Sequence, residues 1–207
     1  MRILIFGASG RAGKHIVKAA LERGHVVLAF TRNPVGFPLG HPKLEVARGD
    51  VLDYPSVLAA VRGAHGVICA LGTANVKGTT VLSRGTANIV RAMDEQGLRR
   101  LVCLSSAGLF GRDGGALLGR PVGPLRLRHV LADKRRQAGV LEASGLDWVL
   151  VRAARFQDKP ATGCCQVTYG RPAGPGIALG DLAGFLVSEL ESGAHFRLMP
   201  IVSGPRR

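Results

Sequence analysis

The sequence predicts an α/β fold of the doubly wound type, in which one parallel sheet carries helices on both faces within a single domain over residues 1–207. An apolar run at the start of the chain ends in three closely spaced glycines, and strand-like and helix-like segments then alternate along the chain. A chain of 207 residues also suits one such domain, because it can bury a substantial core without disulfides or metal.

The first strand is predicted over residues 2–6, a short apolar run that reads as fully buried. The next helix is predicted over residues 15–23 and ends at Gly24. Four apolar residues share one face of that helix: Ile16, Val17, Ala20 and Leu21.

Gly7, Gly10 and Gly13 separate this strand from this helix. Glycines at such a junction permit a tight turn, close approach of a pyrophosphate and close helix packing, while the first N–H groups of the helix face the anion. The spacing departs from the G-x-G-x-x-G form, and a plain turn before a helix is the alternative interpretation. Because a strand precedes the glycines and a helix follows them, we expect a Rossmann-type dinucleotide site.

The remaining segments continue the alternation. Further strands are predicted over residues 25–31, 44–47, 66–71, 100–104, 147–151 and 196–202, with a short one near 166–169, and helices over 55–61, 79–96, 125–143 and 181–190. Right-handed crossovers place the carboxyl ends of parallel strands along one crevice. The residues expected there are Gly7, Arg32, Asp50, Gly72 and Ser106. Residues 107–128 and 155–176 are predicted as loops on the substrate side of this crevice.

The formal net charge is +14 and comes mostly from arginine. The arginines are scattered along the chain without a basic helix or an aromatic-interleaved patch, so neither nucleic acid nor a membrane surface is the expected partner. The densest region runs from Arg99 to Arg136, where nine basic residues meet only Asp113 and Asp133. Such a local excess favours an anionic ligand.

The sequence offers no apolar stretch of roughly 20 residues that could cross a bilayer and no signal-peptide pattern, so a cytoplasmic location is expected. Cys69 and Cys103 lie in apolar strands and are interpreted as buried small hydrophobes. Cys164 and Cys165 are sequence neighbours, and the chain has no C-x-x-C pair. A metal site and an oxidising compartment are therefore not expected.

The end of the second strand indicates which dinucleotide is bound. An acidic residue there accepts from the ribose 2′-hydroxyl of NAD, whereas arginine accommodates the 2′-phosphate of NADP. This chain has Thr31-Arg32-Asn33, with Arg32 nineteen residues after Gly13. Arg11, within the glycine turn, is a second candidate donor to that phosphate. The pattern favours NADPH, with a solvated surface arginine as the alternative interpretation of Arg32.

The tyrosines argue against common carbonyl chemistry. Short-chain dehydrogenases protonate the developing alkoxide with a tyrosine that has a lysine four residues on. Here Tyr54 is followed at that offset by Leu58 and Tyr169 by Ala173, so alcohol dehydrogenation and sugar epimerisation are disfavoured. Two alternatives stay open: hydride transfer to a conjugated acceptor such as an isoalloxazine or a bilin, or no chemistry, as in a redox-sensing binding protein.

Several motifs, taken in order, resemble the biliverdin IXβ reductase and flavin reductase family of atypical short-chain dehydrogenases/reductases, with NmrA-like relatives. They are IFGASGRAG (5–13), GDVLD (49–53), ALGT (70–73), TTVLSRGTANIVRAM (79–93), LSSA (104–107), LEASGLDWVLVRA (141–153) and QDKPATG (157–163). The resemblance covers nearly the whole chain. It implies a monomeric NADPH-dependent reductase of FMN and riboflavin, and of biliverdin or quinones, with flavin as a substrate and not a tightly bound group.

The resemblance also implies site residues. The cofactor-binding set is Gly7, Ser9, Gly10, Arg11, Ala12, Gly13, Arg32, Asp50, Val51, Leu71, Gly72, Leu104, Lys134 and Arg155. Ser106 and Arg155 are the implied catalytic residues, and Ser106, Arg126 and Arg171 the implied substrate-binding residues. The Ser106 hydroxyl would hold the carboxamide or donate to the acceptor ring, although a strand-end serine is as often only a capping group.

The chain departs from the family at Arg155 and Lys134, where histidine is frequent. A second arginine after Arg32, and one after the Gly72-Thr73 pair, are also missing. A permanently charged Arg155 cannot relay a proton, but it could hold a negative reduced flavin or the nicotinamide amide. The sequence therefore predicts a flavin or bilin reductase, and the alternative is a non-catalytic NADP(H)-responsive regulator of the NmrA-like type.

Overall fold

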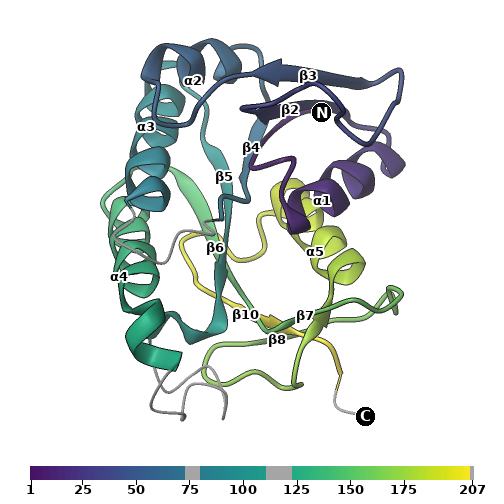
Figure 1. Ribbon diagram of the computed structural model, residues 1–207, viewed down its shortest axis with the longest axis vertical. Helices are drawn as coiled ribbons and strands as arrows, with labels where there is room; N and C mark the ends of the chain where they lie inside the picture. The colour runs from purple at the N-terminus through teal and green to yellow at the C-terminus, as the bar shows by residue number, and fades with distance from the viewer. Residues whose placement is uncertain (73–79, 111–122, 206–207) are drawn as a thin grey trace.

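The structure is a computed structural model that describes residues 1–72, 80–110 and 123–205, with only the backbone of residues 109–110 and 123–127. Its main sheet has eight strands in the order β3-β2-β1-β4-β5-β6-β10-β8 (Figure 1). In chain order these are β1 (Arg2–Phe6), β2 (Val26–Thr31), β3 (Leu44–Arg48), β4 (Gly66–Cys69), β5 (Arg100–Ser106), β6 (Asp147–Ala153), β8 (Gln166–Thr168) and β10 (Ile201–Ser203). All neighbours pair in parallel except β10 and β8. This order confirms the predicted doubly wound sheet.

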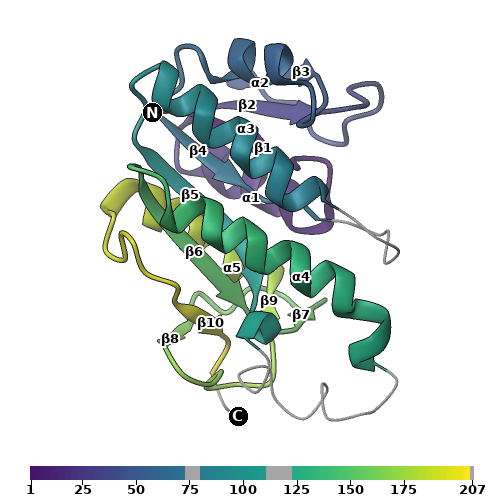
Figure 2. The ribbon, with the colours of Figure 1, turned by 90° about the vertical axis from the view of Figure 1, so that its left-hand side faces the viewer.

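Helices cover both faces of the sheet, as predicted (Figures 1 and 2). One face carries α1 (Arg11–Glu22) and α5 (Leu179–Ser192). The other carries α2 (Tyr54–Val61), α3 (Val81–Glu95) and α4 (Gly123–Glu142). Along β1, Ile3 and Ile5 belong to the first of these two cores and Leu4 and Phe6 to the second. Because both faces are buried, the central strands are continuous apolar runs.

Several predicted boundaries are wrong. Helix α1 begins at Arg11, four residues before its predicted start. Its first turn packs through glycine, so the apolar periodicity from which the helix was predicted does not extend to that turn. Helix α4 begins at Gly123, two residues before the helix predicted over 125–143, so the end of the loop predicted over 107–128 is helical. The predicted strand over 196–202 forms only at Ile201–Ser203, where it pairs with β6 and β8. The rest of the loop predicted from residue 107, over 111–122, lies outside the described residues.

The segment between β6 and α5 contains short strands. Residues Phe156–Gln157 (β7) pair in parallel with Ile177–Ala178 (β9). Strand β8 joins the main sheet as its antiparallel edge. The segment predicted as a loop over residues 155–176 is therefore paired twice: near its start with β9, in a separate two-stranded sheet, and in its middle with the main sheet through β8.

No helix within the described ranges is long and apolar enough to span a membrane. In the same part of the chain, no cluster of three or more histidine, cysteine or acidic side chains could hold a metal ion.

The start of α3 is held by a carboxylate from the neighbouring helix. Asp133 of α4 is fully buried; its Oδ2 accepts from the backbone N–H of Leu82 at 2.9 Å, and its Oδ1 accepts from the N–H and hydroxyl of Ser83 at 3.3 and 2.5 Å. Thr80, the N-cap residue of α3, makes no side-chain cap. Asp133 thus caps the N-terminus of α3 from a neighbouring helix. Its negative charge also interacts favourably with the positive end of the α3 dipole.

Asp133→Ala leaves buried N–H groups of α3 without acceptors, so we expect it to lower the free energy of unfolding by about 3 kcal/mol. The measurement is urea denaturation followed by circular dichroism. Asp94→Asn, at an exposed position on α3, is the matched control and should change stability by less than about 0.5 kcal/mol. A loss no larger than that of the control would contradict the capping role.

Candidate functional site

A cleft of about 1650 Å³ follows the carboxyl ends of the parallel strands, as the sequence predicted. The predicted site residues that line it are Gly7, Ser9, Gly10, Arg11, Ala12, Arg32, Asp50, Val51, Leu71, Gly72, Leu104, Ser106, Lys134, Arg155 and Arg171. Gly13 is not among the lining residues because it lies beneath the turn. Arg126 belongs to α4, and its side chain lies outside the described residues.

The glycine turn is shaped by contacts that leave no room for side chains. Gly7 has φ +75°, and a Cβ there would lie 2.5 Å from the carbonyl oxygen of Ala70. A Cβ on Gly13 would overlap the carbonyl oxygen of Gly7, which also accepts from Gly10 N at 3.0 Å. The turn therefore brings α1 close against the end of β1.

The start of α1 is free to bind an anion. Its N-cap, Gly10, offers no side-chain cap, and its first turn contains no acidic residue. The first N–H groups of a helix have no intrahelical acceptor. Their position in the cleft wall, beside a turn without side chains, fits a dinucleotide pyrophosphate.

The end of β2 presents a hydroxyl and an arginine. The Thr31 hydroxyl donates to Ser9 Oγ at 3.1 Å, which ties this strand end to the glycine turn. Arg32 is exposed and lines the cleft, and no carboxylate in the described ranges pairs with it. This arrangement suits a phosphate and offers no acidic acceptor for a ribose hydroxyl.

The wall next to Arg32 is built by the turn after β3. Asp50 Oδ1 accepts from Leu52 N at 2.9 Å, so this carboxylate is engaged within its own turn. Asn88 of α3 donates to the carbonyl oxygen of Val51 at 2.9 Å. A Cβ on Gly85 would lie 2.8 Å from Val51, so this glycine lets α3 pack closely behind the apolar wall.

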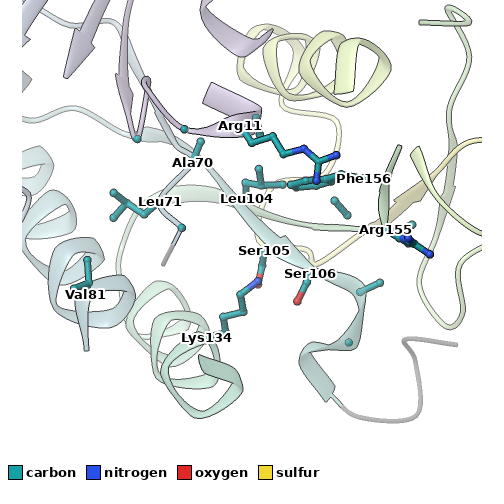
Figure 3. Close-up of a pocket in the computed structure, with 18 of the residues that line it drawn as sticks. Arg11, Ala70, Leu71, Val81, Leu104, Ser105, Ser106, Lys134, Arg155 and Phe156 are labelled. Atoms are coloured by element: carbon teal, nitrogen blue, oxygen red, sulfur yellow. The ribbon is translucent and has the colours of Figure 1, made fainter. Parts of the chain in front are cut away.

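Arg11 is already paired. Its Nη2 lies 2.6 Å from Asp158 Oδ2, and the two side chains are 54% and 78% exposed. Its guanidinium also lies 5.8 Å from the ring centroid of Phe156 (Figure 3). The hydrogen bond from Arg11, helped by its charge, lowers the pKa of Asp158. This pair links the start of α1 to the segment after β7, and the role of Arg11 as a phosphate donor stays a prediction.

Two serines and a lysine meet at the end of β5. Ser106 is half-buried and lines the cleft. Ser105 is 3% exposed, and its Oγ has no hydrogen-bond partner in the part of the chain that the structure describes. Lys134 of α4 points toward Ser105 (Figure 3), and burial lowers the pKa of its amine to about 8. Sequence reasoning missed Ser105, because the buried position of its hydroxyl depends on α4.

The cleft is strongly cationic. Arg32, Lys134, Arg155 and Arg171 line it, and none has a carboxylate partner among the described residues. The acid that lines it is Asp50, which binds its own turn. An anionic ligand is the complement of such a surface.

The two predicted catalytic residues are not brought together. Arg155 is exposed and extends away from Ser106 and Lys134 (Figure 3). The side chain that Figure 3 shows pointing toward the strand-end serines is that of Lys134. Val130 stands four residues before this lysine, so the site has a lysine without the tyrosine of the common dehydrogenase pair.

The chain belongs to a known family. Residues 7–192 match the family described as NAD(P)H-binding. An uncharacterized chloroplastic protein of Arabidopsis thaliana is 30% identical over 174 residues, which cover 78% of this chain and 61% of the relative. A 3-beta-hydroxysteroid dehydrogenase of Mycolicibacterium neoaurum is 35% identical over 117 residues, 51% of this chain and 32% of the relative. The chain thus spans less than two thirds of the length of these relatives.

Solved structures share the fold across the chain. The oxidoreductase ylbE from Lactococcus lactis has a TM-score of 0.86 at 18% identity, covering 100% of this chain and 92% of that protein. A short-chain dehydrogenase/reductase from Veillonella parvula, in complex with NADP, has a TM-score of 0.79 at 19% identity, covering 99% and 94%. Both confirm the α/β fold. The narrower resemblance to biliverdin IXβ reductases stays a prediction.

Gly13→Ala forces the start of α1 away from the Gly7 carbonyl, so we expect at least about tenfold weaker NADPH binding, or about 1.4 kcal/mol. The measurement is quenching of protein fluorescence during NADPH titration. Gly139→Ala is the matched control, because Gly139 lies in α4 with open space around it. It should leave binding unchanged and raise stability by up to about 1 kcal/mol. Equal NADPH affinity in Gly13→Ala and wild type would refute the assigned turn.

Proposed function

We propose that this protein is an NADPH-dependent reductase that transfers hydride to flavins such as FMN and riboflavin, with biliverdin or quinones as further acceptors. One feature of the cleft carries the proposal: among the described residues, the arginine at its β2 end has no carboxylate partner, and the lysine at its other end has no tyrosine four residues before it. The first feature favours NADPH, and the second favours an acceptor that needs no tyrosine acid.

The cofactor would lie along the strand ends. The N–H groups at the start of α1 would bind the pyrophosphate and Arg32 the 2′-phosphate. Asp50, Val51 and Leu71 would border the adenine, with Gly72, Leu104 and Lys134 toward the nicotinamide. When bound, NADPH supplies a hydride from the nicotinamide ring.

The protein would act on the acceptor by positioning. Ser106 would donate a hydrogen bond to the acceptor ring, and Arg171, with Arg126 and Arg155, would attract its phosphate or carboxylate groups. A flavin spreads added electron density over its conjugated rings, so orientation beside the cofactor supplies much of the rate. The flavin would enter as a substrate, and one copy of the chain supplies every residue named here.

The relatives support an oxidoreductase over a regulator. Their names include a 3-beta-hydroxysteroid dehydrogenase, a cinnamoyl-CoA reductase and a bifunctional pinoresinol-lariciresinol reductase. Each name describes redox chemistry, although these proteins share at most 35% identity with this chain. The acceptor of this protein is therefore argued from its own cleft.

The direct test follows NADPH oxidation by absorbance with FMN, riboflavin, biliverdin isomers and quinones. We expect catalysed oxidation with at least FMN or riboflavin, because these acceptors are planar and need little acid catalysis. Tight NADPH binding without turnover of any acceptor would contradict the proposal. That result would instead support the non-catalytic NADP(H)-responsive regulator.

Arg32→Ala tests the choice of cofactor. Removing the guanidinium takes away the partner of the 2′-phosphate, so NADPH should bind at least about tenfold more weakly, while NADH binding stays unchanged. Calorimetric titration with both cofactors gives the ratio. Arg48→Ala, at the end of β3 and outside the cleft, should leave the ratio unaltered. Equal losses for NADPH and NADH in Arg32→Ala would contradict the assignment.

A further inference from the structure

A buried hydroxyl at the end of β5 has no partner. Ser105 is 3% exposed, and its Oγ makes no hydrogen bond within the described residues. Leaving such a group unsatisfied lowers the stability of the fold, so it calls for an explanation. Ser105 is a lining residue of the cleft, and its hydroxyl oxygen is buried behind that lining.

The amine of Lys134 approaches the same place from α4. Figure 3 shows this side chain rising from the helix toward Ser105, on the side of the cleft where Ser106 also lies. Lys134 has no carboxylate partner among the described residues. Removing an ammonium from water without a counter-charge disfavours its charged form, and burial lowers the pKa of Lys134 to about 8.

Among the described residues, the charged and polar groups near Lys134 on α4 and β5 offer its ammonium no free carboxylate. On α4, Asp133 is turned to α3, where it binds Leu82 and Ser83, and it also accepts from Arg136. The end of β5 offers the hydroxyls of Ser105 and Ser106.

Among the described residues, β6 and the cleft lining that follows it add no carboxylate either. On β6, Arg152 donates to the carbonyl oxygens of Met199 and Tyr169. Beyond β6 stand Arg155 and Arg171, both cations. Desolvation is accordingly the cause that lowers the pKa of Lys134.

We propose that Lys134 is the proton donor of the reduction, and that the Ser105 hydroxyl positions its ammonium toward the acceptor. This inference rests on the proposed reductase function. It gives Lys134 a role beyond cofactor binding, and it gives the buried hydroxyl of Ser105 a partner during the reaction.

The step balances. The acceptor gains a hydrogen and an electron pair as hydride, so the acceptor is reduced and the nicotinamide is oxidised. One N–H bond of the Lys134 ammonium breaks, and the proton bonds to the acceptor nitrogen or oxygen where negative charge develops. The neutral amine then regains a proton from water.

Other groups in the described lining are poorer donors. Arginine does not release its proton near neutral pH, which removes Arg155 and Arg171. A serine hydroxyl can relay a proton but does not supply one by itself, and the Asp50 carboxylate is held in its own turn. Val130 stands one helical turn before Lys134, so no tyrosine intervenes between the ammonium and the acceptor.

The test compares the pH dependence of kcat in wild type and Lys134→Arg. A proton donor must be protonated, so the wild-type kcat should fall as the pH rises through about 8. Arginine keeps the positive charge but cannot donate, so Lys134→Arg should lose at least tenfold in kcat together with this descending limb. Its NADPH affinity should stay within threefold of wild type. Lys18→Arg, on the exposed face of α1, is the matched control and should behave as wild type.

A second measurement is independent of turnover. Protein labelled with ¹³C at the lysine ε-carbon should show one resonance that titrates near pH 8 and disappears in Lys134→Arg. Ser105→Ala tests the positioning role. This substitution should lower kcat and leave the KM for NADPH unchanged. It should also shift the descending limb of the kcat profile to lower pH, because a hydroxyl that accepts from the Lys134 ammonium favours the charged form of the lysine.

The results distinguish failure of the proposed reductase function from failure of the roles proposed for Lys134 and Ser105. Absence of turnover by wild type with every acceptor would overturn the proposed function. Turnover in which Lys134→Arg keeps the wild-type kcat and descending limb would overturn only the role of Lys134. Titration of every lysine resonance above pH 10 would also overturn it, and an unchanged profile in Ser105→Ala would overturn the role of Ser105.

Discussion

The close contact between the Gly7 turn and the start of α1 is the constraint on which the site depends. A side chain on Gly7 would meet the Ala70 carbonyl, and one on Gly13 would meet the Gly7 carbonyl. With both absent, α1 begins at the carboxyl edge of β1 and its uncapped N–H groups open into the cleft. The doubly wound sheet then brings the ends of β2, β4, β5 and β6 to the same edge. Backbone packing of this kind leaves the first N–H groups of α1 available to an anion without a side-chain cap.

Charge divides the cleft into two chemical regions. Arg32 marks one end, where the carboxylate of Asp50 is engaged in its own turn, and Lys134 with the strand-end serines marks the other. The ion pair between Arg11 and Asp158 joins the start of α1 to the segment after β7. A reductase for a planar, anionic acceptor uses each of these features without requiring a tyrosine.

The fold could be predicted from the sequence because its signals are local. The apolar strand at residues 2–6, the three glycines and the alternation of segments depend on neighbours in the chain, and the structure confirms them. Strands β7 and β9 have two residues each, too few to show a period. Arg11 and Asp158 are 147 positions apart, and the buried hydroxyl of Ser105 depends on α4. The resemblance implied Lys134 as a cofactor-binding residue. Its lowered pKa comes from burial, which depends on the folded structure and not on the residues next to it in the sequence.

A crystal structure of the protein grown with NADP⁺ tests the central claim most directly, because it locates the pyrophosphate. We expect the pyrophosphate oxygens within hydrogen-bond distance of the backbone N–H groups of Arg11 and Ala12, with the 2′-phosphate beside the Arg32 guanidinium. A dinucleotide bound away from the Gly7–Gly13 turn, or a 2′-phosphate pointing into solvent on the far side from Arg32, would contradict it.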